Sequence, residues 1–269
     1  KNFEFIIIND GSNHETTSKL NEIKNKDSRV KLFNKDNTGL TKSLNFGINR
    51  CKYEWIARID SDDYWDKKKL NKINQVINLY PNLSLITSSW ITVDDKNNII
   101  RSNSPNTNKI KKNIVKLMPV IAHSSAVINT KILRKVGLYT DKLDSSQDLD
   151  LWFKILKYGD IFNILDPLVF IREHKKQISY SKRKNQILNS IIIQLNYLVL
   201  GKKRMNIFLD YNLNKYFKIK EKIKNELEKI KYFNLRIKYE KTRRKIQKNS
   251  LIKQILIIII FNYKYLFFY

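Results

Sequence analysis

The sequence predicts an α/β fold with a Rossmann-like, mostly parallel sheet flanked by helices, followed by a helical, basic C-terminal extension. Over residues 1–174, strand-like apolar runs alternate with segments whose apolar residues recur at helical spacing, a pattern typical of parallel sheets. From about residue 182 onward the spacing is helical, and Lys and Arg are abundant. A chain of 269 residues suits one large domain, or one domain with an extension.

The first elements follow from apolar spacing. The run Phe3–Ile8 predicts a buried strand that ends at a polar turn. Leu40, Leu44 and Ile48 lie at i, i+4 and i+8, which predicts a helix over residues 40–49. The other elements predicted in this stretch are a helix at 15–26, strands at 30–33, 55–59 and 83–93, and a helix at 67–80.

The pattern is looser after the strand at 83–93. Asp94–Asn98 predicts a hairpin turn, and Leu151, Ile155 and Tyr158 share one face of a helix. The other predicted elements are a polar loop at 102–108, a strand at 126–128, a short helix at 131–136 closed by a glycine, and a strand at 161–171.

Carboxylates follow two of the predicted strands. Asp60, Asp62 and Asp63 come directly after an apolar strand, where like charges at this spacing repel one another. A divalent cation bound to a phosphorylated ligand would stabilise them; the alternative is a solvated acidic turn that caps the next helix. Asp10 also ends a strand, and ligands of such sheets bind outside the carboxyl ends of the strands. We therefore expect the two acidic segments to line one crevice.

The net charge of +27 is unevenly distributed. Residues 175–269 hold 24 Lys or Arg against 5 Asp or Glu, a net +19, whereas residues 1–174 carry +8. This tail predicts an anionic partner such as a membrane surface, nucleic acid or another polyanion; the alternative is a set of solvated helices. The terminal segment 251–269 is too short to span a bilayer. Its aromatic residues and neighbouring lysines favour contact with a membrane interface over a helix packed on the core.

Six segments together resemble a known family. Phe5–Ser12, Asn37–Asn45 and Arg58–Asp63 resemble the nucleotide-binding half of the family 2 glycosyltransferases, whose fold is called GT-A. His123–Ser125, Gln147–Trp152 and Arg172–His174 resemble the acceptor half of that family. The resemblance implies a GT-A domain over 1–180, with a nucleotide-sugar half at about 1–95 and an acceptor half at about 96–180, followed by the basic region 181–269. It also implies a further strand upstream of Lys1, so we expect the sequence to be truncated or the protein to be shortened.

The resemblance implies a role in donor binding for five residues. Asp10 would accept a hydrogen bond from the base, usually uracil, Asp60 would contact the ribose or metal-bound water, and Lys42 would also contact the nucleotide. Asp62 and His174 would bind the metal, Mn²⁺ or Mg²⁺, and an imidazole ligand favours Mn²⁺. The alternatives are a structural turn for Asp10 and a loop histidine for His174.

The resemblance assigns the chemical step to Asp148. In inverting members a carboxylate at this motif takes the proton from the acceptor hydroxyl as that oxygen attacks the anomeric carbon. Asp148 alternatively caps a helix, and Asp150 is a weaker choice for the base. Side chains two positions apart on a helix point in different directions, so Asp148 and Asp150 cannot share this role. The remaining residues, expected to support the site or to line its acceptor side, are Asp63, His123 and Gln147, the last standing where many relatives have Glu.

The resulting expectation is an inverting, metal-dependent transferase of hexosyl or N-acetylhexosaminyl groups. It would act on a nucleotide-sugar, with UDP the expected nucleotide, and on a hydroxyl of a glycan or lipid-linked acceptor in surface-polysaccharide biosynthesis. The single Cys51, the absence of a signal peptide and the basic tail predict a cytoplasmic protein, peripheral on the inner face of the membrane and bound to anionic lipid. No nucleic-acid partner is expected; the alternatives are a basic nucleic-acid-binding protein and an inactive glycosyltransferase-like scaffold.

Overall fold

The computed structural model describes residues 3–104, 121–143 and 145–174, together with six single residues: Gln177, Gln186, Asn189, Ser190, Ile193 and Tyr197. The chain divides into two units, residues 1–111 with 120–174, and residues 112–119 with 175–269. All elements below belong to the first unit. The predicted segment 251–269 and most of the predicted helical region lie outside the described residues. No helix in the described part of the chain has both the length and the apolar character that a bilayer crossing requires.

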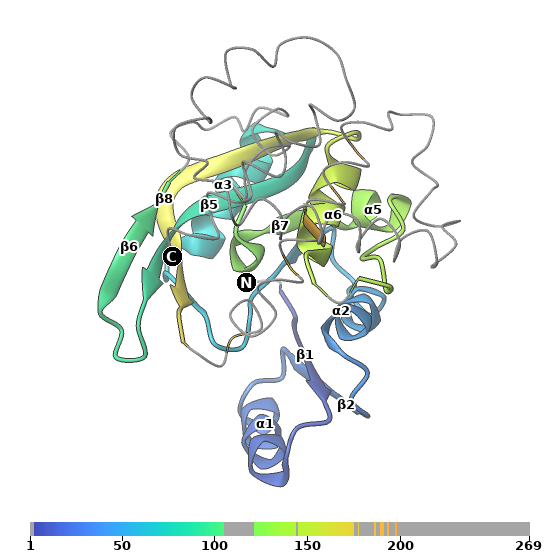
Figure 1. The fold of residues 1–269 in the computed structure, drawn as a ribbon, viewed down its shortest axis with the longest axis vertical. Coiled ribbons are helices and arrows are strands. Elements are labelled where there is room, and N and C mark those ends of the chain that lie inside the picture. The colour runs from blue at the N-terminus through green and yellow to red at the C-terminus, as the bar shows by residue number, and fades with distance from the viewer. Residues whose placement is uncertain are drawn as a thin grey trace, which may run out of the picture. The chain divides into compact units, whose positions relative to one another are not determined.

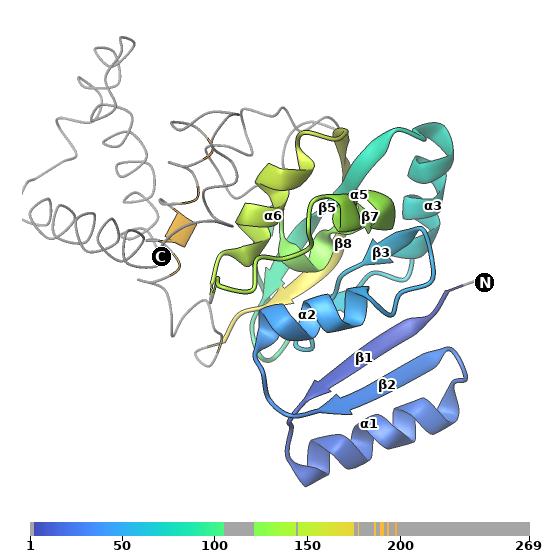
Figure 2. The ribbon, with the colours of Figure 1, turned by 90° about the vertical axis from the view of Figure 1, so that its right-hand side faces the viewer.

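A small parallel sheet begins the fold. It consists of β1 (Phe5–Asp10) and β2 (Val30–Lys35), which are connected by α1 (His14–Lys26). α1 packs on β2, and α2 (Leu40–Ile48) packs on β1 (Figure 2). α1 begins where Asn13 accepts a hydrogen bond from the backbone N–H of Thr16, a common helix cap.

The larger sheet has six strands in the described residues. The order is β3-β7-β5-β8-β4, with β6 paired to β5 (Figure 1). The strands are β3 (Trp55–Ala57), β4 (Tyr64–Trp65), β5 (Leu83–Val93), β6 (Ile99–Asn103), β7 (Val127–Asn129) and β8 (Asp160–Arg172). The helical elements of this part are α3 (Lys69–Leu79), the 3₁₀ turn η1 (His123–Ser125), α5 (Thr130–Lys135) and α6 (Gln147–Ile155).

The α/β class with a sheet flanked by helices is confirmed, but the strand pairing is mixed. β1–β2 and β5–β8 are parallel, whereas β3–β7, β4–β8, β5–β6 and β5–β7 are antiparallel. The expectation of a mostly parallel sheet is therefore corrected. A tight hairpin requires antiparallel strands, which explains β5–β6. β7 enters the sheet between β3 and β5 in the reverse direction, a placement that apolar spacing does not encode.

Both faces of the larger sheet are covered. Ile73 and Val76 of α3 pack with Ile86 of β5 and Val127 of β7 in one apolar cluster. Since side chains alternate along a strand, Leu85 points to the opposite face, and it is also fully buried. This accounts for the nearly continuous apolar or small-residue composition of β5, the longest buried strand of the described part.

Most predicted elements are present with shifted ends. The strand predicted at 55–59 ends at Ala57, and the hairpin turn at Asp94–Asn98 joins β5 to β6. β4 is not indicated by the sequence pattern, and β6 extends to Asn103, which corrects the start of the polar loop predicted at 102–108. β8 continues across Pro167, where its register with β5 shifts. A proline has no N–H to donate, so an irregular ladder at this position is expected.

Candidate active site

The acidic segment is a tight turn between two strands. After β3, the backbone N–H of Arg58 donates to the carbonyl of Ala126 at 2.9 Å, which extends the pairing of β3 with β7 by one hydrogen bond. The N–H of Asp63 then donates to the carbonyl of Asp60 at 3.2 Å and closes the turn that leads into β4. The carboxylates therefore start from a backbone fixed on both sides, rather than from a free loop.

Asp60 is held by a cation and by a serine. Arg58 forms an ion pair with one carboxylate oxygen, and the other lies 2.9 Å from the hydroxyl of Ser124. The backbone N–H of Asp60 also donates to that hydroxyl oxygen, at 3.0 Å. Burial alone would raise the pKa of Asp60, but the charge of Arg58 and the Ser124 hydrogen bond hold it below its usual range. Asp60 is therefore ionised at neutral pH.

Asp63 lies on the other side of the same serine. One carboxylate oxygen is hydrogen bonded to the hydroxyl of Ser124, and the other accepts the backbone N–H of Arg172 at 3.0 Å. Burial raises the pKa of Asp63 to about 6, assisted by the charges of Asp60 and Asp62 and opposed by the two hydrogen bonds. The three carboxylates thus have distinct surroundings, although they are close in sequence.

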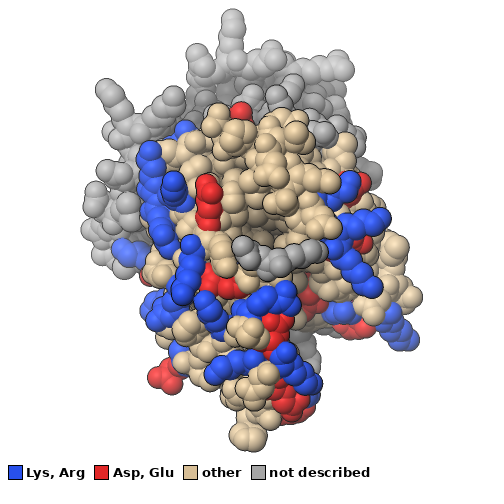
Figure 3. All heavy atoms as spheres, turned by 180° about the vertical axis from the view of Figure 1, so that it is seen from behind, with Lys and Arg blue, Asp and Glu red and all other residues tan. Residues whose placement is uncertain are grey.

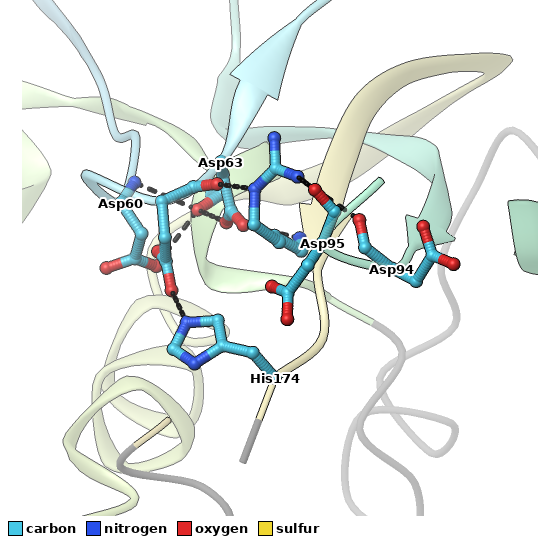
Figure 4. Close-up of polar contacts among 8 residues, drawn as sticks. Asp60, Asp63, Asp94, Asp95 and His174 are labelled. Carbon is cyan, nitrogen blue, oxygen red and sulfur yellow. Dashed lines mark hydrogen bonds and ion pairs between the residues drawn. The ribbon is translucent and has the colours of Figure 1, made fainter. Parts of the chain in front are cut away.

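Asp62 and His174 meet in space across 112 residues of sequence. Nε2 of His174, just beyond the end of β8, lies 3.2 Å from Oδ2 of Asp62 (Figure 4). Two ligands at adjacent positions of an octahedral ion with bonds of about 2.1 Å would lie about 3.0 Å apart, so this pair of donors fits a shared cation. No group of three or more His, Cys, Asp or Glu side chains suited to a metal is found among the described residues.

Arg172 connects the acidic turn to the β5–β6 hairpin. Its Nε donates to the carbonyl of Asp62 at 3.2 Å, and one terminal nitrogen donates to the carbonyls of Asp94 and Asp95 (Figure 4). The other terminal nitrogen donates to the side chain of Asn97 at 2.9 Å. With its own N–H on Asp63, Arg172 fixes both the main chain of Asp62 and a neighbouring carboxylate. His174, two residues later, is thereby directed toward Asp62.

His123 is enclosed by aromatic side chains. Its Nε2 lies 2.7 Å from the hydroxyl of Tyr139, and its ring packs edge to face with Tyr139 and Trp152. Burial and the charge of Arg58 lower its pKa to about 4, against the opposing charges of Asp148 and Asp60. His123 is therefore neutral at pH 7.

Asp148 lies in the first turn of α6, after a backbone in an uncommon conformation. Ser146, which precedes the helix, has a φ of 58°, a left-handed value that often accompanies functional sites. No hydrogen bond or ion pair joins the carboxylate of Asp148 to another residue of the described part. Asp150 is 1% exposed and is bound by Thr140 at 2.7 Å and Lys154 at 2.8 Å. Asp150 thus serves the packing of α6, whereas the half-buried Asp148 remains available for chemistry.

Asp10 lies at the end of β1 and binds the start of α2. Its carboxylate oxygens accept the backbone N–H groups of Thr38 and Gly39, each at 2.9 Å, and it forms an ion pair with Lys35. Burial would raise the pKa of Asp10, but these donors hold it below its usual range. No contact within the described residues joins Asp10 to the acidic turn, so the expected common crevice stays a prediction. Lys42 is exposed on α2.

Gln147 is buried directly before Asp148 at the start of α6. Figure 3 shows Lys and Arg side chains spread over one face of the molecule, with Asp and Glu side chains among them. The acidic turn therefore lies in a part of the chain whose overall charge is positive, which favours an anionic ligand.

Sequence patterns do not indicate four residues that shape this site: Arg58, Lys69, Ser124 and Tyr139. Lys69 is 1% exposed, and burial lowers its pKa to about 7 against the charge of Asp63. Arg58 has a buried Nε without a hydrogen-bond partner in the described part. The available signal for Arg58 and Ser124 was their place in the motifs Arg58–Asp63 and His123–Ser125, whereas Lys69 and Tyr139 act across contacts that spacing does not reveal.

Comparison with known proteins identifies a family. The model of "Glycosyl transferase family 2" matches residues 1–137. An uncharacterized glycosyltransferase of Rickettsia felis is 29% identical over 185 residues, which cover 66% of this chain and 30% of that protein. The O-antigen biosynthesis glycosyltransferase WbnJ of Escherichia coli is 31% identical over 184 residues, covering 66% of this chain and 71% of the relative. The chain thus spans less than a third of the Rickettsia relative and most of the E. coli one.

Solved structures show the same fold. Staphylococcus aureus TarS, residues 1–349 in complex with UDP-GlcNAc, aligns with a TM-score of 0.58 at 17% identity, over 80% of this chain and 64% of that one. A mannosyltransferase of Pyrobaculum calidifontis in complex with GDP-Man and Mn²⁺ aligns with a TM-score of 0.53 at 12% identity, over 97% of this chain and 76% of that one. At these identities the likeness shows the GT-A fold alone.

Proposed function

The chain belongs to glycosyl transferase family 2, and from that premise we propose that it is an inverting, metal-dependent glycosyltransferase that uses a nucleotide-sugar donor. The observation that carries the proposal is the convergence of Asp62, from the β3–β4 turn, and His174, from the end of β8, on one point. A carboxylate and an imidazole brought together from distant parts of the chain form a donor pair suited to Mn²⁺.

The acidic turn supplies a binding place for the diphosphate of the donor. Asp62 and His174 would hold the divalent ion, and Asp60 would contact the ribose or ordered water. The ion, when bound, supplies Lewis-acid stabilisation of charge on the departing nucleoside diphosphate. Asp63 and Arg172 hold the turn in shape. The backbone N–H of Arg172 donates to the carboxylate of Asp63, and its Nε donates to the carbonyl of Asp62, so neither bond involves the side chains of Asp62 and His174. Asp10 and Lys42 would contact the nucleotide.

Asp148 would act as the general base. It would take the proton from the acceptor hydroxyl while that oxygen attacks the anomeric carbon from the face opposite the leaving group, so the configuration inverts. Asp148 is half-buried and has no Lys or Arg hydrogen bonded to it within the described residues, which suits this role because a carboxylate paired with Lys or Arg is a weaker base. His123 and Gln147 would line the acceptor side, with His123 held in place by Tyr139.

The finer identity of the substrates is also part of the proposal. We favour a UDP-linked hexose or N-acetylhexosamine as donor and a glycan or lipid-linked hydroxyl as acceptor. The E. coli relative named for O-antigen biosynthesis supports a place in surface-polysaccharide assembly. Cytoplasmic, peripheral attachment to anionic lipid through the C-terminal region agrees with its net charge of +19.

The experiment that tests this function compares two matched substitutions on α6. Release of nucleoside diphosphate from UDP-GlcNAc, UDP-glucose and GDP-mannose is measured with Mn²⁺ and with EDTA. We expect Mn²⁺-dependent turnover of at least one donor, and a loss of about 10²–10⁴-fold in kcat for Asp148→Asn, because the proton acceptor is removed.

Asp150→Asn is the control, since it makes the same change of charge two residues away. It should lower the thermal midpoint by breaking the contacts with Thr140 and Lys154, while the folded protein keeps most of its turnover. Full turnover by Asp148→Asn would refute the general base. Absence of metal-dependent turnover and donor binding by the unsubstituted chain would refute the enzyme.

A further inference from the structure

Ser124 occupies the centre of the acidic turn although it comes from a distant segment. It belongs to η1, is 1% exposed, and reaches residues that precede it by 61 and 64 positions. Its hydroxyl oxygen accepts the N–H of Asp60 at 3.0 Å and lies 2.9 Å from a carboxylate oxygen of Asp60. The same hydroxyl is hydrogen bonded to Asp63. One small side chain therefore joins the two carboxylates that flank Asp62.

The main chain of Ser124 is fixed independently of its hydroxyl. Its carbonyl accepts a hydrogen bond from Nζ of Lys69 at 3.1 Å and another from Nε1 of Trp65 at 3.1 Å. Lys69 also lies over the ring of Trp65, 4.3 Å from its centre. Because α3 and β4 hold this carbonyl, the direction of the hydroxyl is set by the fold, and removal of the hydroxyl leaves the backbone in place.

The single hydroxyl hydrogen of Ser124 limits how many carboxylates it can serve as a donor. A serine hydroxyl has one hydrogen, so it can donate to Asp60 or to Asp63 but not to both at once. Arg58 pairs with the other oxygen of Asp60, and the backbone N–H of Arg172 donates to the other oxygen of Asp63. Each flanking carboxylate thus has two partners inside the turn, while the side chain of Asp60 stays 34% exposed. Asp62 differs, because its side chain contacts His174.

We propose that Ser124 is a positioning residue for the metal and diphosphate of the donor: by holding Asp60 and Asp63 together, it leaves Asp62 as the carboxylate of the turn that faces His174. This inference rests on the proposed function of the same site. Without the hydroxyl, either flanking carboxylate is free to turn toward the cation, and the geometry of the Asp62–His174 pair is no longer selected. Residues that orient metal ligands typically change metal affinity about 10–100-fold when they are replaced.

The test is a calorimetric titration of the full chain with Mn²⁺ in the presence of saturating UDP. We expect Ser124→Ala to raise the Kd for Mn²⁺ by about 10–100-fold. Ser125→Ala is the matched control, because Ser125 is also 1% exposed and lies in the same turn, but its hydroxyl contacts Thr87 and the carbonyl of Ala122 and no carboxylate. The Kd of Ser125→Ala for Mn²⁺ should stay within about twofold of that of the unsubstituted chain. Ser124→Thr, which keeps a hydroxyl, should retain most of the Mn²⁺ affinity.

Thermal midpoints of both alanine variants separate metal binding from stability. A purely structural role would lower the two midpoints alike and leave the two Kd values equal, and that result would overturn the inference. If Ser124→Ala does not fold, Ser124→Cys is titrated instead, since a thiol is a weaker donor of similar size. An unchanged Kd in that variant would equally overturn the inference. Failure of the unsubstituted chain to bind Mn²⁺ with UDP would instead refute the proposed function.

Discussion

At the scale of single residues, Asp10 connects the end of a strand to the start of a helix. Both carboxylate oxygens accept backbone N–H groups, from Thr38 and Gly39, and Lys35 provides the counter-charge. Gly39 has a φ of 90°, which is readily adopted by glycine and aims its N–H at Asp10. Asp10 therefore has a structural role whether or not it also contacts the nucleotide base.

Asp10→Asn should lower the free energy of unfolding by about 1–2 kcal/mol at pH 7, because a charged acceptor is lost. The folded-state pKa of Asp10 lies below its usual range, so its stabilising contribution is present above the unfolded value, about 4, and is lost as the pH falls through the folded value. Urea unfolding at pH 7, 5 and 3 measures this. The difference between the two proteins should be largest at pH 7 and should shrink as the pH falls below about 4.

The exposed neighbour Asp36 provides a control for this measurement, since Asp36→Asn removes the same charge without loss of these hydrogen bonds. Its unfolding free energy should follow that of the unsubstituted chain at each pH. An Asp10→Asn difference that persists unchanged to pH 3 would show that the carboxylate charge is not its source.

The sequence predicted individual site residues unevenly. Asp62 and His174 could be named in advance because each belongs to a motif, and the structure brings them together. Ser124 also lies in a motif, His123–Ser125, but no role could be assigned to it or to Tyr139, because their importance depends on a close approach between segments more than ten residues apart. The roles of Asp148 and Asp150 could be distinguished only in part, since helical spacing shows that their side chains point in different directions but not which residues they contact. The contacts of Asp150 with Lys154 and Thr140 complete that distinction.

At the scale of elements, Arg172 links two turns that flank the site. One is the β3–β4 turn, reached through Asp62 and Asp63, and the other is the β5–β6 hairpin turn, reached through three further acceptors. A planar guanidinium can serve several acceptors in fixed directions, whereas an ammonium group cannot. The hairpin is therefore part of the support of the site, although it contributes no proposed ligand.

Arg172→Lys should lower the free energy of unfolding by about 2 kcal/mol or more, because several hydrogen bonds to the guanidinium are lost. Amide hydrogen exchange should accelerate in the turn at 94–98 and in the acidic turn at 60–63. Arg101→Lys is the control, since Arg101 forms an ion pair with Glu173 at 2.8 Å and such surface pairs contribute little. Equal exchange rates in both variants would contradict the proposed link.

Periodicity predicted the helices and the long strands well, and it failed where pairing is not local. α2, α3 and β5 lie within two residues of their predicted ends, because each carries a full apolar face. β4 has two residues and β6 begins with two exposed isoleucines, so neither carries a readable pattern. The reverse direction of β7 depends on its neighbours in the sheet, which no single segment specifies.

At the scale of the whole molecule, charge separates the catalytic part from the C-terminal region. Residues 175–269 carry a net +19, compared with +8 for the preceding part. Each Lys or Arg close to an anionic bilayer contributes about 1 kcal/mol, so a few of these residues suffice for attachment. Attachment would bring the site to lipid-linked acceptors.

Removal of residues 251–269 should abolish sedimentation of the chain with vesicles that contain phosphatidylserine. The expected cause is the loss of an aromatic, interfacial segment flanked by lysines. Binding of the full chain should also weaken as the salt concentration rises, and it should be absent with neutral phosphatidylcholine vesicles. Equal binding by the shortened chain would refute this segment as the anchor, and equal binding to neutral vesicles would refute the electrostatic contribution.

In the proposed site, Asp62 and His174 bind one divalent ion together with a nucleoside diphosphate. The decisive measurement is the Kd for Mn²⁺ in the presence of UDP for Asp62→Asn, His174→Asn and the double variant, with the exposed His14→Asn as control. Each single substitution should raise the Kd by about tenfold or more. The fold increase in Kd of the double variant should be smaller than the product of the two single increases, since both side chains bind one ion. Fully multiplicative effects, or a Kd unchanged in either single variant, would contradict the shared site.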